Sequence, residues 1–260
     1  MSTPTTFVHL SDLHLAAPGK LVYGIDSLRQ AREVLARIAR LDVAPAFVVV
    51  SGDLSEDGSA ASYEMLARLL EDFGETPVLL ALGNHDNRMQ FRRVGLGEVG
   101  SDGQEPYVHS RLSDGLRVIV LDSTIPNETC GALGAAQLAW LEEELQLPAP
   151  RGNLIMLHHP CRLAAPARHE PLFILQDAAA LEAVVARHRE RVRGVLAGHS
   201  HQANAAPFGG TLHATAPAVL CQLDFFAGEQ FAPVPGGGFN LCQIDDGGLV
   251  VNPVLVEGDG

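Results

Sequence analysis

The chain has 260 residues, of which 47% are hydrophobic and 19% charged, as in a globular protein with one large domain or two smaller ones. Its net charge of −13 and the absence of any basic cluster argue against a nucleic-acid polymer as partner. No apolar run approaches the roughly 18 residues of a membrane span, and no signal peptide is recognisable. We therefore expect a cytoplasmic protein without a membrane partner.

Six short apolar runs, taken in chain order, are each followed by residues of the types that bind metals. The runs span residues 7–10, 47–50, 78–82, 118–121, 154–157 and 195–197. The residues that follow them are Asp12 and His14, Asp53, Asn84-His85-Asp86, Asp122-Ser123, His158-His159, and His199-Ser200-His201. Such runs are typical of strands buried on both faces. Ligands of sheets flanked by helices gather beyond the carboxyl ends of the strands, so these tips should meet.

Helical patterns alternate with the strands, which predicts an α/β fold. Helices are expected over residues 26–41 and 135–147, and two more should begin at the N-caps Ser59 and Asp177. Beyond residue 205 short β-like runs separated by glycines take over. They end in a predicted hairpin of residues 241–244 and 249–256, with Pro253 on an edge strand or at a bulge. We expect one domain over residues 1–260, with a core at about 5–205 and a β-rich segment at about 206–260.

The strand tips offer enough nitrogen and oxygen donors for two metal ions. Asp12 and His14 are two residues apart and can reach one ion, whereas Asp53 is an isolated carboxylate suited to bridging two. Asn84 adds an amide oxygen. Imidazole nitrogens come from His158, His199 and His201. This donor set without cysteine suits manganese, iron, zinc or cobalt.

Two alternatives accompany this interpretation. Each residue taken singly could be a cap or turn residue after a strand, where Asp and Asn are common; only the complete ordered set favours metal binding. Neighbouring residues of an extended strand point to opposite faces, so only one of His158 and His159 should face the metals. We favour His158.

The ordered motifs resemble those of the calcineurin-like metallophosphoesterases over roughly residues 5–205. The motifs are Asp12-x-His14, Gly52-Asp53, Gly83-Asn84-His85-Asp86, His158 and Gly198-His199-x-His201. Residues 52–63, 121–123, 137–141 and 158–160 are similar, more narrowly, to bacterial class III cyclic-nucleotide phosphodiesterases and their glycerophosphodiesterase relatives. The segment 161–176 departs from that subgroup. It is expected to be a loop that sets substrate selectivity.

The resemblance implies an α/β sandwich of two β-sheets face to face, flanked by helices, with a binuclear metal centre. One metal would be held by Asp12, His14, Asp53 and His201, and the other by Asp53, Asn84, His158 and His199. His85 would act near the leaving group, and Asp86 would orient His85. The two ions, divalent or of mixed valence, would be manganese or iron in the first place, with zinc or cobalt as alternatives.

The resemblance also implies hydrolysis of a small phosphodiester, with a 3′,5′-cyclic nucleotide (cAMP or cGMP) as the first choice. A hydroxide bridging the two metals would attack phosphorus in line with the leaving oxygen. The alternatives are a broader glycerophosphodiester or phosphomonoester hydrolase on the same scaffold and a metal-binding regulator without turnover. The full ligand set and His85 argue against the regulator. The oligomeric state stays open, a homodimer included.

Overall fold

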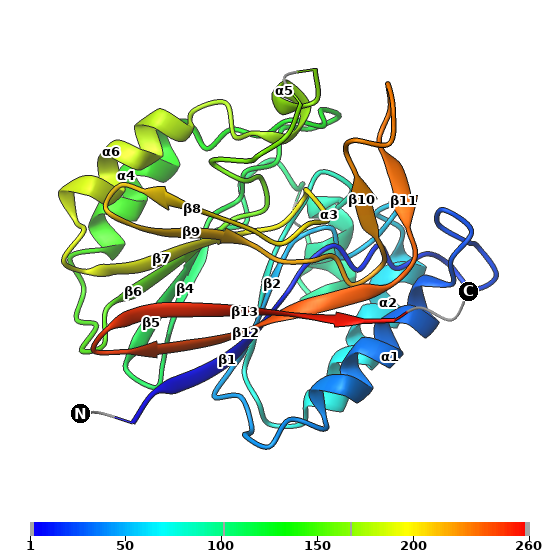
Figure 1. Ribbon diagram of the computed structural model, residues 1–260, viewed down its shortest axis with the longest axis horizontal. Coiled ribbons are helices and arrows are strands. Elements are labelled where there is room, and N and C mark those ends of the chain that lie inside the picture. The colour runs from blue at the N-terminus through cyan, green and yellow to red at the C-terminus, as the bar shows by residue number, and fades with distance from the viewer. Residues whose placement is uncertain (1–2, 101, 167, 258–260) are drawn as a thin grey trace.

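The computed structural model describes residues 3–100, 102–166 and 168–257. A five-stranded sheet has the strand order β13-β12-β1-β2-β3. Its strands β13, β12 and β1 lie side by side in Figure 1. Its strands are β1 (Thr5–Leu10), β2 (Val48–Ser51), β3 (Val78–Ala81), β12 (Gly237–Asp245) and β13 (Gly248–Val256). Strands β1, β2 and β3 are parallel, and β12 pairs antiparallel with β1. The C-terminal segment therefore extends the sheet that the N-terminal strand begins.

A six-stranded sheet has the strand order β4-β5-β6-β7-β9-β8. Its strands are β4 (His109–Ser113), β5 (Leu116–Val120), β6 (Asn153–Met156), β7 (Val192–Ala197), β8 (Asn204–Phe208) and β9 (Thr211–Thr215). Strands β5, β6 and β7 are parallel neighbours. All six apolar runs thus form strands, as predicted, three in each sheet. A separate pair joins β10 (Gln222–Asp224) to β11 (Ala232–Val234).

Helices cover the outer faces of the two sheets. The longer ones are α1 (Ser27–Ile38), α2 (Ala60–Leu70), α4 (Gly134–Glu144) and α6 (Ala178–Arg187). Short turns of helix form α3 (Arg88–Gln90) and α5 (Glu170–Phe173), with a 3₁₀ turn at Glu71–Phe73 and a π turn at Phe91–Gly95. None of the helices among the described residues has the length and apolarity needed to cross a bilayer.

Three buried cores hold these layers together. Val8 on β1 belongs to the core under α1 and α2, whereas its neighbour Phe7 belongs to the core between the sheets, because successive strand residues face opposite sides. Val118 on β5 meets Phe7 in that central core. The third core packs α4 and α6 on the second sheet through residues such as Leu141 and Val184. This is the predicted arrangement of two sheets flanked by helices.

The helix starts follow their capping residues with one difference. The side chains of Asp26 and Ser59 each accept the backbone N–H three residues on, so α1 and α2 begin where predicted. Asp177 precedes α6, yet its carboxylate accepts the backbone N–H groups of Leu133 and Gly134. Asp177 therefore caps α4, a helix more than 40 residues earlier in the chain.

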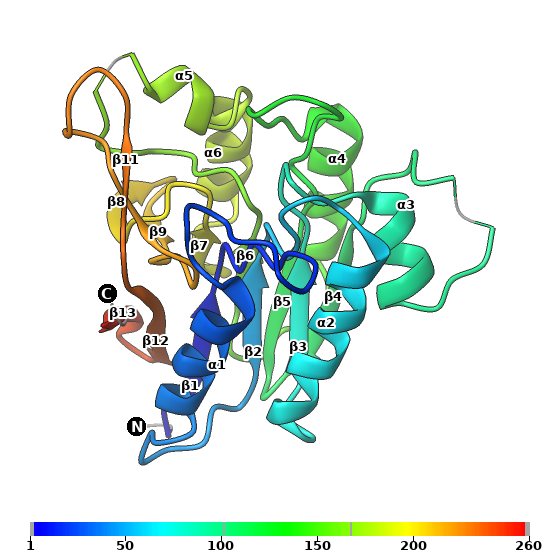
Figure 2. The ribbon, with the colours of Figure 1, turned by 90° about the vertical axis from the view of Figure 1, so that its right-hand side faces the viewer.

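The predicted terminal hairpin forms, with a longer first strand. Strands β12 and β13 pair from Gly237 with Val256 to Asp245 with Gly248, and β13 lies at the edge of its sheet. Pro253 lies within β13, where the missing N–H leaves the outer edge of the sheet unpaired rather than breaking an inner ladder. The carboxyl ends of parallel strands meet at one edge, and the loops that follow them build the site (Figure 2).

Candidate metal centre

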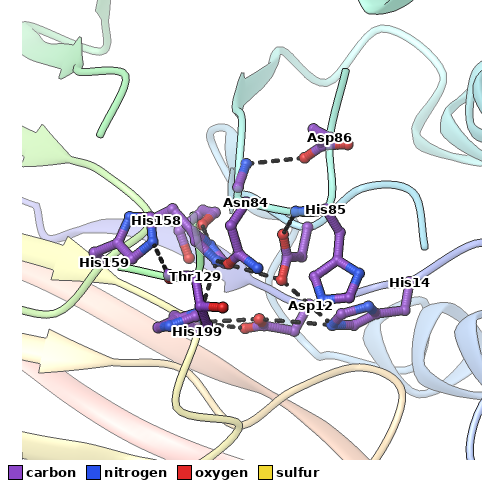
Figure 3. A network of polar contacts seen from close by, with 12 residues as sticks. Asp12, His14, Asn84, His85, Asp86, Thr129, His158, His159 and His199 are labelled. Atoms are coloured by element: carbon purple, nitrogen blue, oxygen red, sulfur yellow. Dashed lines mark hydrogen bonds and ion pairs between the residues drawn. The ribbon is translucent and has the colours of Figure 1, made fainter. Parts of the chain in front are cut away.

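Side chains from both sheets converge beyond the strand ends, as Figure 3 shows for Asp12, His14, Asn84, His158 and His199. In chain order they are Asp12, His14, Asp53, Asn84, His158, His199 and His201. All are buried except Asn84, which is half-buried. The loops after β1, β2 and β3 supply the first four, and those after β6 and β7 supply the rest. The structure thus brings together all seven residues that were expected to bind metal.

Five of these seven residues have a left-handed backbone conformation, which is costly for residues other than glycine. They are Asp12 (φ 55°), His14 (φ 46°), Asp53 (φ 49°), His199 (φ 66°) and His201 (φ 54°). Only three other non-glycine residues in the described part of the chain share that conformation. Sharp turns at the strand ends therefore point these side chains into one space, at a cost typical of functional sites.

The glycines of the motifs leave room for the donor groups. A Cβ atom at Gly83 would overlap the carboxylate of Asp53, and one at Gly198 would overlap Ser11 and approach Asp12. Backbones of different loops therefore pass close behind the two aspartates. This explains why a glycine precedes Asn84 and His199 in the sequence.

The first group of donors surrounds Oδ1 of Asp12. The Nε2 atoms of His14 and His201 lie 4.0 and 3.6 Å from that oxygen and 3.1 Å from each other. Oδ2 of Asp53 lies 3.5 Å from Nε2 of His14. The backbone N–H of His199 donates to both oxygens of Asp12, which fixes the carboxylate. One ion could contact Asp12, His14 and His201, and Asp53 adjoins this group through His14.

The second group of donors surrounds Nε2 of His158. That atom lies 3.1 Å from Nδ1 of His199, 3.2 Å from Oδ1 of Asn84 and 3.3 Å from Oδ2 of Asp53. Two ligands at about 2.1 Å from a metal and at right angles to each other are about 3 Å apart. The distance of each of these donors from His158 is therefore that between two ligands of one ion.

Asp53 lies between the two groups. The backbone N–H of His85 donates to its Oδ1, which leaves Oδ2 between His14 and His158. Burial favours a neutral carboxyl group, but the neighbouring imidazoles, His158 first, hold the pKa of Asp53 well below its usual range. Burial likewise opposes charge on His158, yet Asp53 raises the pKa of that histidine to about 9. Asp53 is thus an anion placed to serve two cations at once.

The tautomers of the four inner histidines fit bound metals. In each ring the outer nitrogen faces a protein acceptor and holds one proton, so the inner nitrogen can bind either a second proton or a metal. The acceptors are Glu56 Oε2 for His14, the Ser51 carbonyl for His158, the Leu172 carbonyl for His199 and the Cys221 carbonyl for His201. Lone pairs that face each other at 3.1 Å repel unless a cation or proton lies between them. The donor set and its orientation therefore fit two metal ions.

His159 is placed differently from His158. Its Nδ1 lies 2.8 Å from the Ser123 hydroxyl and its Nε2 lies 3.0 Å from the Thr129 carbonyl oxygen. Burial, together with the neighbouring His158, lowers the pKa of His159 to about 3, so the ring is neutral. Both of its nitrogens have protein partners, whereas His158 has one nitrogen free to face the metals. This geometry favours His158 as the ligand.

His85 and Asp86 are adjacent in sequence but have separate surroundings, which corrects the expected orienting role of Asp86. The Asp86 carboxylate accepts the backbone N–H groups of Leu54, Ser55 and Gly83 and the Tyr63 hydroxyl. The His85 ring instead places Nδ1 3.0 Å from the backbone oxygen of Glu56 and 3.5 Å from its carboxylate. Asp86 therefore shapes the loop, and Glu56 orients the ring.

Glu56 is the functional residue that the sequence patterns did not identify. Its carboxylate accepts from Nδ1 of His14 at 2.7 Å and also lies beside His85. Burial would lower the pKa of His14, but the bond to Glu56 and the nearby aspartates outweigh burial and raise it. Glu56 follows Asp53 by three residues in the loop after β2, a spacing that carries no recognisable signal on its own.

Removing the Glu56 carboxylate should weaken the centre without destroying it. We expect Glu56→Ala to lower metal affinity or turnover by about 10- to 100-fold, the usual effect of losing a partner that orients a ligand. Elemental analysis and turnover measured on the same sample provide the test. Glu64→Ala is the matched control, since that exposed carboxylate on α2 contacts Arg68 instead. Wild-type metal content and turnover in Glu56→Ala would mean that His14 is oriented without Glu56.

Five of the seven donors form the floor of a cavity of about 220 Å³. Its lining residues are His14, Tyr23, Asp53, Asn84, His85, Thr129, Leu172, Phe173, His199, His201, Leu223 and Phe231. Leu172 and Phe173 come from the segment 161–176 that was expected to border the substrate. Arg162, in the same segment, instead donates to the Pro207 carbonyl and is not part of this lining.

Asp122 and Ser123 follow β5 but are not part of the donor cluster. Arg88 binds both oxygens of the Asp122 carboxylate, at 2.6 and 3.1 Å, and Ser123 contacts His159. The Arg88–Asp122 pair links the loop after β3 in one sheet to the end of β5 in the other. It therefore holds the two halves of the site together.

Comparison with known proteins agrees with this geometry. Residues 5–203 match the family model described as calcineurin-like phosphoesterase. A "probable cyclic nucleotide phosphodiesterase" of Rhodococcus erythropolis is 35% identical over 257 residues, which cover 94% of this chain and 81% of that protein. A cAMP/cGMP dual specificity phosphodiesterase of Mycobacterium tuberculosis is 35% identical over 259 residues, covering 97% and 80%.

Two further relatives widen the comparison. A glycerophosphodiester phosphodiesterase of Enterobacter lignolyticus is 28% identical over 222 residues, which cover 84% of this chain and 78% of that protein. Among solved structures, a dimetal phosphatase from Danio rerio superposes with a TM-score of 0.67 at 18% identity, covering 99% of this chain and all of that one. The similarity to the dimetal phosphatase concerns the fold alone.

Proposed function

We propose, from the premise that this chain belongs to the calcineurin-like phosphoesterase family and is a metal-dependent phosphodiester hydrolase, that its substrate is a 3′,5′-cyclic nucleotide. The observation that carries the proposal is the cavity whose floor is the double donor cluster and whose size is about 220 Å³. That is below the roughly 300–1,000 Å³ typical of sites for drug-sized ligands, so the cavity suits a small diester. The similarity to two cyclic-nucleotide phosphodiesterases over most of the chain supports the same substrate class.

We assign the seven donors to two ions. Asp12, His14 and His201 would hold the first, Asn84, His158 and His199 the second, and Asp53 both. When bound, two ions supply positive charge that stabilises the phosphoryl transition state and activates a water nucleophile. The nitrogen and oxygen donors suit manganese or iron, and also zinc or cobalt.

The residues of the chain then position the substrate and move a proton. His85 lines the cavity beside Asn84, and its Nδ1 is directed to the backbone oxygen of Glu56. Its Nε2 is therefore the atom that can donate a proton to the leaving oxygen, or a hydrogen bond to its developing charge. Burial of the floor excludes bulk water, which strengthens every charge interaction with the phosphate.

A glycerophosphodiester is the second candidate because another cavity adjoins the first. This cavity of about 440 Å³ shares Asn84 and His85 with the first and is lined mostly by polar residues. They include Asp57, Asn87, Asp102, Gln104 and Asn127. A polar alcohol group leaving next to His85 would find hydrogen-bond partners there.

Metal removal followed by a substrate panel tests the function. Chelation should lower turnover of cAMP and of bis(p-nitrophenyl) phosphate by about 10³-fold or more, and manganese, iron, zinc or cobalt added singly should show which metal restores it. The panel then compares kcat/KM for cAMP, cGMP, a glycerophosphodiester and a phosphomonoester. Higher values for the glycerophosphodiester or the monoester would favour the corresponding alternative. A metal-loaded protein that turns over none of them would be a metal-binding regulator.

A further inference from the structure

The cavity above the donor cluster has walls of a different character from its floor. The floor is polar, whereas Tyr23, Leu172, Phe173, Leu223 and Phe231 form the walls. A phosphate needs only the floor. Apolar and aromatic walls next to it therefore call for a substrate with an apolar, flat part close to its phosphate.

Tyr23 occupies a strained position on one wall. Val22 and Ile25 pair with each other, so Tyr23 and Gly24 are the two central residues of a tight turn. Both have positive φ, 50° and 81°, in a turn that normally carries Asn-Gly. A bulky residue there is a conformational outlier, and its side chain remains 52% exposed. Burial in the core does not account for this tyrosine, whereas contact with a ligand in the cavity does.

Phe231 is supported by other aromatic side chains of the protein. Its ring lies 5.9 Å from that of Phe173 and 6.4 Å from that of Phe225, and the rings of Phe173 and Phe225 are 4.9 Å apart. Phe173 and Phe225 are buried, so they support Phe231, which is only half-buried. Phe173 also packs against the donor His199, with 4.9 Å between ring centroids. The aromatic wall is thus continuous with the metal centre.

We propose that Tyr23 and Phe231 form a stacking subsite for the base of the nucleotide, which would make them determinants of substrate preference. The inference rests on the proposed function and adds to it the residues that contact the nucleoside. Stacking suits every base, since each has an aromatic face, so this subsite admits both adenine and guanine. The ribose would then contact residues of the adjoining polar cavity of about 440 Å³.

A base-free substrate provides the test. We compare cAMP with 1-O-methyl-ribose 3′,5′-cyclic phosphate, which has the same phosphate and the same leaving oxygen. In the metal-loaded enzyme Phe231→Ala and Tyr23→Ala should each raise KM for cAMP by about 5- to 150-fold, the range for loss of one aromatic stacking contact. Neither should change kcat/KM for the base-free diester. Tyr23→Phe should behave like wild type, because it keeps the ring.

Phe226→Ala is the matched control. Phe226 lies on the same connection between β10 and β11, is 72% exposed and does not line the cavity, so its removal should leave KM for cAMP unchanged. Equal losses on both substrates, or none on cAMP, would overturn the subsite. Calorimetric affinity for AMP gives a readout without turnover. It should fall in both alanine variants even if wild type proves inactive on cAMP, so a wrong function can be told from a wrong subsite.

Discussion

Replacing Asp53 with alanine is expected to remove both metal ions from the purified protein and to lower turnover of every diester by about 10³-fold or more. Its Oδ2 lies between the two donor groups, 3.5 Å from Nε2 of His14 and 3.3 Å from Nε2 of His158. Metal charge stabilises a phosphoryl transition state by several kcal/mol, and each 1.36 kcal/mol corresponds to a factor of ten in rate. Elemental analysis and kcat, measured on the same sample, provide the readouts.

A variant that affects one donor group alone sharpens this test. Asn84 contacts only the second group, so Asn84→Ala should lose one metal per chain where Asp53→Ala loses two. Asp53→Asn keeps the size of the side chain and removes its charge, which separates loss of the carboxylate from collapse of the loop. Two metals retained in Asp53→Ala would show that each ion is held by its own ligands and that Asp53 does not bridge them.

The sequence sufficed for the strands because of how they are buried. Each of the six runs is apolar on both faces, as strands covered by a helix layer and by a second sheet must be. The same property means that the runs do not indicate which strands pair. The runs that become β1 and β5 are alike, although they belong to different sheets. Strand order depends on pairings between distant segments, such as β1 with β12, that no local pattern encodes.

The donors could be predicted because each loop carries them next to a strand end, and strand ends meet. A side chain that contacts a donor from a distant part of the sequence could not be predicted in this way. Glu56 contacts His14 across 42 residues of sequence, and its spacing from Asp53 resembles that of any polar loop residue. The predicted orienting role of Asp86 was wrong for the opposite reason. It adjoins His85 in the chain, yet its carboxylate closes the loop on backbone N–H groups.

The difference between neighbouring and distant contacts also explains why the cap of α4 and the cavity walls could not be predicted. Asp177 stands in the right place to cap its own helix, but tertiary contact directs its carboxylate to α4. Tyr23 and Phe231 lie 208 positions apart in the sequence and line the same cavity. Neither has a neighbour in sequence that suggests binding. The chemistry of a site on strand ends is thus local in the sequence, whereas its selectivity is assembled from distant loops.

His85 should matter in proportion to how much the leaving oxygen needs a proton. The 3′-oxygen of a cyclic nucleotide leaves as a poor alkoxide, whereas p-nitrophenolate is a good leaving group. We expect His85→Ala to slow hydrolysis of cAMP by about 10²- to 10⁴-fold, the usual contribution of a positioned acid. The loss on bis(p-nitrophenyl) phosphate should be clearly smaller, and both metals should remain bound.

The two substrates and the metal content together separate the roles open to His85. Its backbone N–H also donates to Asp53, a contact that alanine keeps, so the variant removes the ring alone. Equal losses on both substrates with two metals bound would make His85 a residue that positions the phosphate, since binding of the phosphate does not depend on the leaving group. Loss of a metal would instead make it a ligand, as its place near His14 and Asp53 permits. Only a loss that grows with the basicity of the leaving oxygen shows that the ring acts on that oxygen, by a proton or by a hydrogen bond, because neither positioning of the phosphate nor metal binding depends on that property.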